Sequence, residues 1–472
     1  MNGPMPIIAR RLVCMFGVIL MCSPRPCLAG GGDLIFADGF ESGDVSFWSG
    51  VVGEIPPCPP DGLSRYPHDQ LVSAITPCVA DRMQSIVATT PVPTDNVFLK
   101  TGASGSATTN FMQCFSDGSA VNLDGRDELQ TAIDYFNQGN AGGSTPFERD
   151  SLAVGIGRSA TWATTGSPSP LEQEVTVIGP RMALVDFGTN DMQLAATYGA
   201  ALDPFYESMH QLLDQLEGGG IMPIITGLNP RADSASAAFW VPTFDVVTRG
   251  IAEQRQSPYL SLFRSMVDLP DMGLLSDGIH GNTYQQPGGG SEPCVFIPSA
   301  LQFNFNLRNL RTLELLDVVR RVGLEGQPAT ANPETWSGSG DQVDPYVVDR
   351  LPFTHTANTV FSPNESVDGY PECNGNDMSG PEFWYRLDLA ESLALRIAVL
   401  DREGVDVDIF LISGSPGSTG CIAASDGVLD TTLAAGTYHV AVDTYVAAGV
   451  PQGGSYLLAV LECEDGDTDC LD

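Results

Sequence analysis

The stretch Met182-Ala-Leu-Val-Asp-Phe-Gly-Thr-Asn-Asp191 decides the fold. Met182 to Val185 is a continuous apolar run, typical of parallel strands that are covered on both faces, and Gly188 begins a polar turn. The pattern therefore predicts a buried strand whose carboxyl end carries Asn190. Ligands bind at that edge of open α/β sheets, and an amide fixed there can donate a hydrogen bond to an oxyanion. The alternative is that Asn190 only completes an Asx-turn.

Apolar strands and amphipathic helices alternate on both sides of this stretch. Asp203 and Pro204 suit the N-cap and the first position of a helix that ends at Gly218. The alternation predicts a parallel sheet with helices on both faces. We expect further strands at 96–100, 151–157, 221–226 and 259–263, and helices at 203–217, 244–254 and 304–322.

The first of these strands runs directly into Thr101-Gly-Ala-Ser104-Gly, the pattern of a strand, a tight turn and the start of a helix. Such a turn exposes a serine hydroxyl at the carboxyl edge of a sheet, beside the unpaired amides of a helix N-terminus. The alternative is that Ser104 caps a helix. The strand at 151–157 ends in Gly155 and Gly157, and a backbone N–H there is a candidate oxyanion donor or part of a plain turn.

A loop after the last strand contains Asp277-Gly-Ile-His280. An Asp three residues before a His can accept the Nδ1 proton, which fixes the tautomer of the ring and leaves Nε2 free as a base. The alternative is a surface turn beside a solvated histidine. We expect His210, among apolar helix neighbours, and His439, within a strand, to be structural.

The 472 residues exceed one ordinary domain, and we expect two folded units. The net charge of −36 falls to about −39 when a leader without acidic residues is removed. Such a charge repels phosphate backbones and anionic lipid surfaces, so nucleic acid is excluded as a partner. Neutral substrates and cations remain as the classes of ligand that this charge allows.

Residues 1–29 have the pattern of a signal peptide, with Arg10 and Arg11 followed by an apolar run and a cleavage site near Ala29. We therefore expect a secreted or periplasmic protein, without a transmembrane segment. Eight cysteines remain after cleavage, an even number that favours disulfides in an exported chain. Pairing nearest neighbours gives Cys58–Cys78, Cys114–Cys294, Cys373–Cys421 and Cys463–Cys470. No Cys-x-x-Cys occurs and the five histidines are scattered, so we expect no metal in the site.

Taken in order, Gly102-x-Ser104, the glycine near 155, Gly188-Thr-Asn190-Asp and Asp277-x-x-His280 resemble the four sequence blocks of the SGNH/GDSL hydrolase family. The resemblance covers roughly residues 95–322. It implies a flavodoxin-like three-layer α/β/α fold and a serine esterase or lipase activity. It also implies Ser104 as nucleophile, His280 as base and Asp277 as the acid that orients it. Asn190, Gly155 and the Ser104 backbone amide would line the oxyanion hole, with Gly157 competing for the position of Gly155.

One residue departs from the family pattern. The usual Gly-Asp-Ser is here Gly-Ala103-Ser104, so an acidic residue beside the nucleophile is missing. Because that residue is not the acid of the triad, activity is not excluded. The glycine-rich and aspartate-rich region between 115 and 150 has no family counterpart that we can name, and is a candidate for substrate specificity.

The pattern changes to short alternating strands after residue 346, which predicts an all-β sandwich. The segments 406–411, 433–443 and 454–458 resemble the bacterial pre-peptidase C-terminal domain. We expect strands at 383–387, 393–400, 407–412, 436–443 and 455–460. Asp401, Asp406, Asp408, Asp426 and Asp443 are candidate calcium ligands, and the tail 462–470 is a weaker one, although acidic loops are expected in any chain of this charge.

These observations predict five segments: a signal peptide (1–29), an N-terminal segment and linker (30–94), the hydrolase domain (95–323), a linker (324–345) and a β-sandwich (346–472). We expect a secreted hydrolase that cleaves carboxylic esters without a required cofactor. Short acyl esters or acyl groups on carbohydrates are the favoured substrates, because no apolar lid helix is visible. The rival hypothesis is an inactive, exported glycan-binding or adhesion protein on the same scaffold.

Overall fold

The computed structural model describes residues 58–59, 63–67, 71–72, 75–286 and 288–470. The predicted signal peptide, 1–29, lies outside the described residues, as do residues 30–57 of the predicted N-terminal segment. Among the described residues, no helix has the length and apolar character needed to cross a bilayer.

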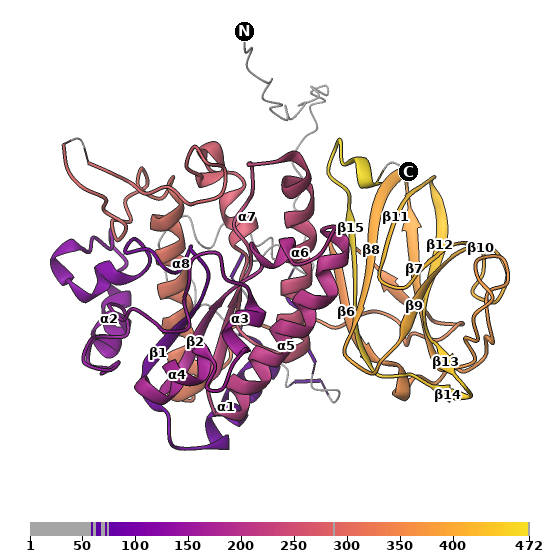
Figure 1. Cartoon of the computed structure of the whole chain (residues 1–472), viewed down its shortest axis with the longest axis horizontal. Coiled ribbons are helices and arrows are strands. Elements are labelled where there is room, and N and C mark those ends of the chain that lie inside the picture. Colours follow the sequence, from indigo (N-terminus) through magenta and orange to yellow (C-terminus); the bar gives the residue numbers. More distant parts are fainter. Residues whose placement is uncertain (1–57, 60–62, 68–70, 73–74, 287, 471–472) are drawn as a thin grey trace, which may run out of the picture. The chain divides into compact units, whose positions relative to one another are not determined.

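A parallel sheet forms the centre of the first half of the chain (Figure 1). Its strands are β1 (Thr94–Gly102), β2 (Pro180–Asp186), β3 (Met222–Thr226) and β4 (Tyr259–Leu260), hydrogen-bonded in the order β1-β2-β3-β4. All three pairings are parallel, and Val154 adds a parallel bridge to Gly102 on the open side of β1. Counting that bridge as a second strand, the order in space is 2-1-3-4-5, which is the flavodoxin-like order.

Helices cover both faces of this sheet, as the alternating pattern predicts. Figure 1 shows α3, α4 and α5 in front of the strands and α8 behind them, which gives three layers. The helices are α1 (Pro77–Thr89), α2 (Gln130–Asn137), α3 (Ala160–Thr164), α4 (Pro170–Ile178), α5 (Leu202–Gly218), α6 (Ala235–Arg255), α7 (Leu262–Met266) and α8 (Asn304–Val319).

Five details of the predicted elements are wrong. No helix begins at Ser104, because residues 103–112 form turns and the first helical segment after β1 is the short 3-10 helix Gln113–Ser116. The segment 151–157 forms only the bridge at Val154, because the chain turns there. The strand at 259–263 ends at Leu260, since the Ser261 side chain caps α7. Helix α6 begins at Ala235, well before 244, because Ser234 caps it and the helix accommodates Pro242. Helix α5 begins at Leu202, so Asp203 lies in its first turn and is not the N-cap.

Two sheets make up the second half of the chain, and they are antiparallel except where β5 pairs with β7. One has the order β10-β9-β12-β7-β5 and the other the order β11-β8-β15-β6. Apolar side chains from both sheets, such as Leu411, Val440, Ile397 and Leu458, form a shared core, which confirms the predicted sandwich. Its strands are β5 (Tyr346–Val348), β6 (Phe353–Asn358), β7 (Glu382–Leu389), β8 (Leu393–Asp401), β9 (Val407–Ser413), β10 (Cys421–Ser425), β11 (Val428–Leu433), β12 (Gly436–Thr444) and β15 (Ser455–Glu462), with the short hairpin β13 (Val446–Ala447) and β14 (Val450–Pro451).

The sandwich packs on helix α6 through its β15 and β6 strands, and the Arg396 side chain of β8 adds a further contact. A Cβ at Gly250 of α6 would come within 2.5 Å of the Leu457 side chain, so the helix backbone lies directly against β15. Arg396 of β8 donates to Thr243 of α6 and lies over the Trp240 ring at 3.5 Å. The apolar core of the α/β half thus continues into this sheet.

All four predicted disulfides are present, namely Cys58–Cys78, Cys114–Cys294, Cys373–Cys421 and Cys463–Cys470. The Cys114–Cys294 bridge ties the segment after β1 to the loop before α8.

Candidate active site

Ser104 lies two residues beyond the end of β1, in a turn that β2 holds. Gly102 pairs with Asp186 in the sheet, and the Ala103 N–H donates to the Asp186 carbonyl at 3.2 Å. A Cβ at Gly102 would come within 2.7 Å of that carbonyl oxygen, so this close approach requires glycine. The Ala107 N–H donates back to the Ser104 carbonyl at 3.2 Å. These contacts fix a tight turn with Ser104 partly exposed at the carboxyl edge of the sheet.

The side chains of Ser104, His280 and Asp277 meet at this edge, although 176 positions separate Ser104 from His280 in the chain. The His280 Nε2 atom lies 3.1 Å from the Ser104 Oγ atom, and Nδ1 lies 2.7 Å from Asp277 Oδ2. The other Asp277 oxygen accepts the N–H groups of Ile279 and His280, both at 3.0 Å. The Asp277 side chain therefore holds both the ring and the backbone of its own turn.

These bonds determine the protonation of the site. Hydrogen bonds from the His280 N–H, the His280 ring and the Ile279 N–H lower the pKa of Asp277 to about 2. An ionised carboxylate only accepts hydrogen bonds, so the proton of the neutral ring is on Nδ1. Nε2 then presents its lone pair to the Ser104 hydroxyl, which is the arrangement of a general base and a nucleophile.

The turn after β2 brings Asn190 to the loop that follows Val154. The Asn190 Nδ2 atom donates one hydrogen to the Arg158 carbonyl at 2.9 Å, and its second hydrogen is available to a ligand. Beside it, the buried Asp191 carboxylate accepts the Ala160 N–H at 2.8 Å and the Gly188 N–H at 2.9 Å. Burial raises the pKa of Asp191 to about 6. Asp191 thus joins the turn at 188–191 to the start of α3, and so fixes the position of Asn190.

Gly155 and Gly157 differ in what their N–H groups do. The Gly155 N–H donates to the Gly102 carbonyl at 3.0 Å, and the Arg158 and Trp162 side chains cover the residue. Gly157 is exposed and has a φ of +69°, a conformation that favours glycine. Within the described part of the chain, neither the Gly157 N–H nor the Ser104 N–H donates a hydrogen bond. Of the two glycines, Gly157 is therefore the one whose N–H is available to a bound ligand.

A buried ion pair that the sequence did not reveal lies beneath the Ser104 turn. Arg308 of α8 is fully buried, and its guanidinium donates to Asp186 Oδ2 at 2.8 Å and to the Gly105 carbonyl at 3.2 Å. The Ser106 hydroxyl donates to the same Asp186 oxygen at 2.7 Å, and Arg308 also lies over the Phe111 ring at 4.1 Å. This network holds the two residues that follow Ser104.

The loop after β3 contacts both the turn that carries Asn190 and the turn that carries His280. The Arg231 guanidinium donates to the Thr189 carbonyl at 3.3 Å, next to Asn190. The Ala232 N–H donates to the Gly278 carbonyl at 2.8 Å, and Gly278 has a φ of +71° with the 232–233 backbone against it. The turn that carries Asn190 and the turn that carries His280 are therefore joined through one loop.

His210 and His439 lie away from this site, as expected. Arg255 donates to the His210 ring, and burial lowers the pKa of that ring to about 3. The His439 ring bonds to the Gly414 carbonyl at 2.7 Å. Neither contacts Ser104.

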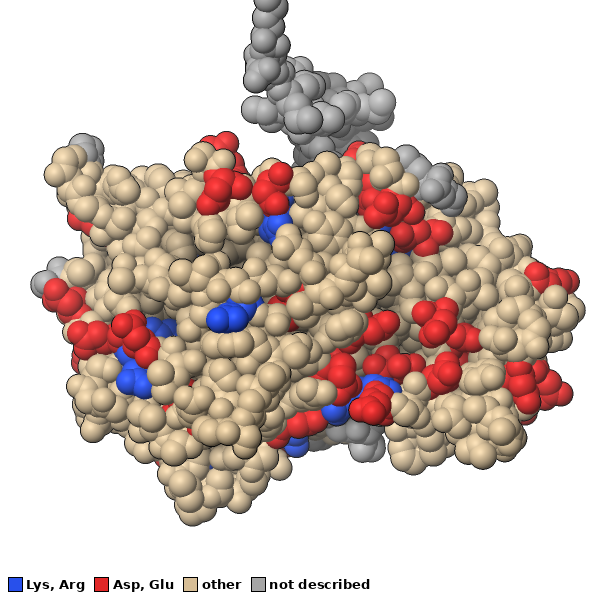
Figure 2. Space-filling view, viewed as in Figure 1, with Lys and Arg blue, Asp and Glu red and all other residues tan. Residues whose placement is uncertain are grey.

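The candidate calcium ligands gather only in part. Oxygen atoms of Asp406, Asp408 and Asp426 lie within 4.8 Å of one another. Burial, together with the repulsion from Asp426 and Asp406, raises the pKa of Asp408 to about 6. Asp401 instead accepts the Val407 N–H, and Asp443 binds the Tyr370 hydroxyl. Acidic side chains also gather without an ion in chains of this charge, and Figure 2 shows far more acidic than basic side chains on the face in view.

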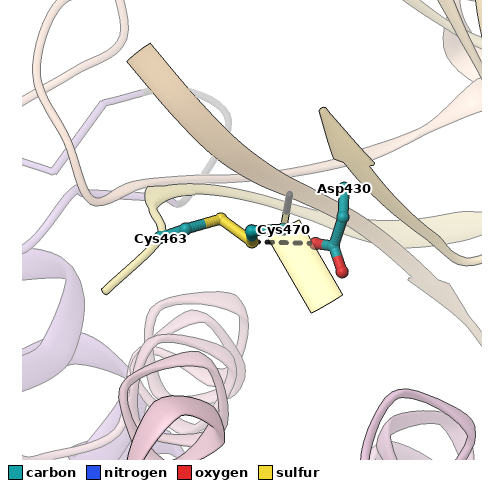
Figure 3. A group of neighbouring side chains, drawn as sticks. All are labelled: Asp430, Cys463 and Cys470. Carbon is teal, nitrogen blue, oxygen red and sulfur yellow. Dashed lines mark hydrogen bonds between the residues drawn. A yellow bond between two sulfur atoms is a disulfide. The ribbon is translucent and has the colours of Figure 1, made fainter. Parts of the chain in front are cut away.

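A second group of potential ligand atoms lies where the C-terminal tail meets β11, and it does not suit a metal. Asp430, Cys463 and Cys470 lie within 4.8 Å of one another, but Figure 3 shows the two sulfur atoms joined in a disulfide. A disulfide sulfur is not a thiolate, so the group lacks the ligands that thiolate sites use.

No protein-family model matches the chain, and no curated protein matches it. Solved structures do resemble it. A GDSL-like lipase from Bacteroides thetaiotaomicron VPI-5482 aligns at 11% identity and a TM-score of 0.30, over 51% of this chain and 98% of that one. A carbohydrate esterase family 3 protein from Talaromyces cellulolyticus aligns at 15% identity and a TM-score of 0.32, over 47% of this chain and 98% of that one.

The second half of the chain also has a counterpart. The pre-peptidase C-terminal domain of a collagenase from Bacillus anthracis aligns at 18% identity and a TM-score of 0.16, over 23% of this chain and 89% of that one. At these identities the likenesses concern the fold and not the activity. Both resemblances drawn from the sequence, to SGNH/GDSL hydrolases and to the pre-peptidase C-terminal domain, thus have counterparts among solved structures.

Proposed function

We propose that the chain is a serine hydrolase that cleaves carboxylic esters through an acyl-enzyme on Ser104. The observation that carries the proposal is the chain of contacts from Ser104 Oγ to His280 Nε2 (3.1 Å) and from His280 Nδ1 to Asp277 Oδ2 (2.7 Å). A surface turn beside a solvated histidine would not require the ring to contact a serine from a different part of the chain.

The reaction has two halves. His280 Nε2 takes the proton of the Ser104 hydroxyl while Oγ bonds to the carbonyl carbon of the ester. The oxyanion is held by the free N–H of the Asn190 amide and by the N–H groups of Ser104 and Gly157. The C–O bond to the alcohol then breaks, and the leaving oxygen takes the proton from His280.

Water completes the cycle. His280 removes a proton from a water molecule, whose oxygen attacks the acyl carbon, and Ser104 leaves with the proton returned by His280. The products are one carboxylic acid and one alcohol. This route requires no cofactor, and we propose short acyl esters or acyl groups on carbohydrates as substrates.

We further propose that the protein acts outside the cytoplasm. Four disulfides support this localisation, because such bonds form and persist in oxidising compartments.

Turnover of p-nitrophenyl acetate and butyrate tests the function. We expect Ser104→Ala and His280→Ala to lose at least about 10³-fold in kcat/KM, while both keep the unfolding temperature of the wild type. Ser85→Ala, which changes an exposed serine on α1, is the matched control and should retain full activity. Equal activity of the Ser104→Ala and Ser85→Ala variants would contradict the proposal.

A further inference from the structure

Exposed apolar side chains are unevenly distributed over the α/β half of the chain. Single exposed apolar residues are ordinary on a protein surface, so only their clustering carries information. Seven large ones are exposed among the described residues of this half, and four lie in the segments that form the candidate site: Leu152, Ile156, Leu194 and Leu275. The other three are Val92, Val177 and Val267.

Backbone contacts place Ile156 and Leu194 beside the oxyanion donors. Ile156 is 79% exposed and lies between Gly155, which is bonded to Gly102, and Gly157, whose N–H is available. The Leu194 N–H donates to the Asp191 carbonyl at 3.0 Å, in the short turn that follows Asn190. The Asn190 amide joins these two segments through the Arg158 carbonyl.

Leu275 lies on the other side of the site. The Leu275 N–H donates to the His280 carbonyl at 2.7 Å. Leu275 therefore lies beside the base and not beside the oxyanion donors. Because His280 gives its proton to the leaving oxygen, the alcohol part of an ester lies on the side of His280. The acyl substituent points away from that ring. It is attached to the carbonyl carbon, and the oxygen of this carbonyl is held by the 155–158 segment and Asn190.

We propose that Ile156 and Leu194 form an acyl-binding lip, and that the preferred substrates are esters of apolar carboxylic acids longer than acetic acid. The proposal rests on the proposed function and narrows its substrate class. Apolar side chains held in water gain by covering an alkyl chain, and the gain grows with the area covered. An acetyl group is too short to reach beyond the oxyanion donors, whereas a butyryl or hexanoyl chain crosses the lip.

A chain-length series tests the lip, with kcat/KM measured on p-nitrophenyl acetate, butyrate and hexanoate. We expect kcat/KM of the wild type to rise about twofold per added methylene, since a lip open to solvent covers only part of each group. In Ile156→Ser/Leu194→Ser the rise should fall to less than about threefold over the whole series.

Val92→Ser is the matched control. Val92 is 82% exposed but lies before β1, at the opposite edge of the sheet from Ser104, and its chain-length series should match that of the wild type. A series that is flat in the wild type, or a double variant that loses equally on all three esters, would overturn the lip and leave the proposed function standing. Absence of turnover of any ester by the wild type, with Ser104 unreactive to a fluorophosphonate, would overturn both.

Discussion

The Asp277 carboxylate binds both the His280 ring and the backbone of its own turn. One carboxylate oxygen binds the His280 ring, and the other binds two backbone N–H groups of the same turn. Such bonds favour the ionised form, which lowers the pKa of Asp277 to about 2. The side chain therefore remains an acceptor at any pH at which a protein is ordinarily assayed, and the ring keeps the tautomer that a base requires.

Asn190 is the residue whose role is easiest to separate from folding. Removing one oxyanion donor typically costs about 10²–10³ in turnover, so Asn190→Ala should lose that much in kcat. Its other contact, to the Arg158 carbonyl, is a single hydrogen bond near the surface, worth about 1 kcal/mol. Thermal unfolding measured beside kcat checks this separation. An Asn190→Ala variant with normal kcat would exclude the side chain from the oxyanion hole.

The turns that carry Ser104, Asp277 and His280 were readable from the sequence because each is local. Asp277 and His280 lie three residues apart, and Ser104 follows its strand directly. The sequence did not predict which of Gly155 and Gly157 has a free N–H. The answer depends on which of the two N–H groups donates to the Gly102 carbonyl. Asp191 appeared in the sequence only as part of the turn, and its bond to the Ala160 N–H joins residues 31 positions apart.

At the scale of elements, helix α8 supports the Ser104 turn through Arg308. The sequence pattern of 304–322 predicted an apolar face, and a charged residue within that helix gave no sign of its partner. The partner, Asp186, lies 122 positions earlier, at the end of β2. Long-range ion pairs of this kind follow from the packing of elements and not from local periodicity.

Replacing Arg308 by Met should therefore affect both stability and reactivity. Leaving Asp186 unpaired beneath the turn costs about 3–5 kcal/mol of unfolding free energy, measured by urea denaturation. As Arg308 positions the turn without touching substrate, kcat should fall while KM changes little, and Arg308→Lys should recover part of the loss. Arg321→Met, which removes a partly exposed arginine from Asp317 while Arg320 still binds that carboxylate, is the control and should cost at most about 1 kcal/mol. Equal effects of the two Met variants would contradict this role.

Helix α8 also limits the loop that carries His280. A Cβ at Gly281 would come within 2.4 Å of the Asn304 Oδ1 atom, at the first residue of the helix. Gly281→Ala should therefore displace the neighbouring His280 and lower kcat/KM by about 10²-fold, the loss expected for a misplacement of about 1 Å. Gly290→Ala, in the same loop with open space around it, should be neutral. Esterase assays on the two variants check this, and full activity of Gly281→Ala would show that the loop has room.

At the scale of the whole molecule, buried acidic groups dominate the response to pH. A carboxyl group with a raised pKa holds its proton in the folded state at a pH where the unfolded chain has lost it. Its contribution to stability is present below about pH 4 and is lost as the pH rises through 6 to 7. Five aspartates have a pKa raised to about 6 or 7, mainly by burial: Asp191, Asp203, Asp245, Asp401 and Asp408.

Three buried histidines among the described residues, His210, His355 and His439, act in the opposite direction, because burial lowers the pKa of each ring. Burial lowers the pKa of His210 and His355 to about 3, so their contribution is lost as the pH falls from about 6.5 to 3. Because the aspartates outnumber them, we expect a higher unfolding temperature at pH 5 than at pH 7.5, at equal ionic strength. Calorimetry measures this directly. A lower unfolding temperature at pH 5 would mean that other groups control stability.

The fold of each half of the chain was predictable from the sequence, but the contact between the halves was not. The parallel sheet and the sandwich follow from runs of apolar residues and from alternation, and the disulfides follow from pairing neighbouring cysteines. The seam between the halves was not predictable, because Leu457 of β15 and Gly250 of α6 form it far apart in the sequence. The residues that support the site share this property, since they meet only once the whole chain has folded.

Labelling of the intact protein with a fluorophosphonate, followed by peptide mass spectrometry, tests the central claim most directly. The account predicts one adduct, on Ser104, that is absent from the Ser104→Ala variant and strongly reduced in His280→Ala. Folded protein that takes up no label would contradict it and would favour the inactive glycan-binding alternative. An adduct on another serine would contradict the assignment of Ser104 as the nucleophile.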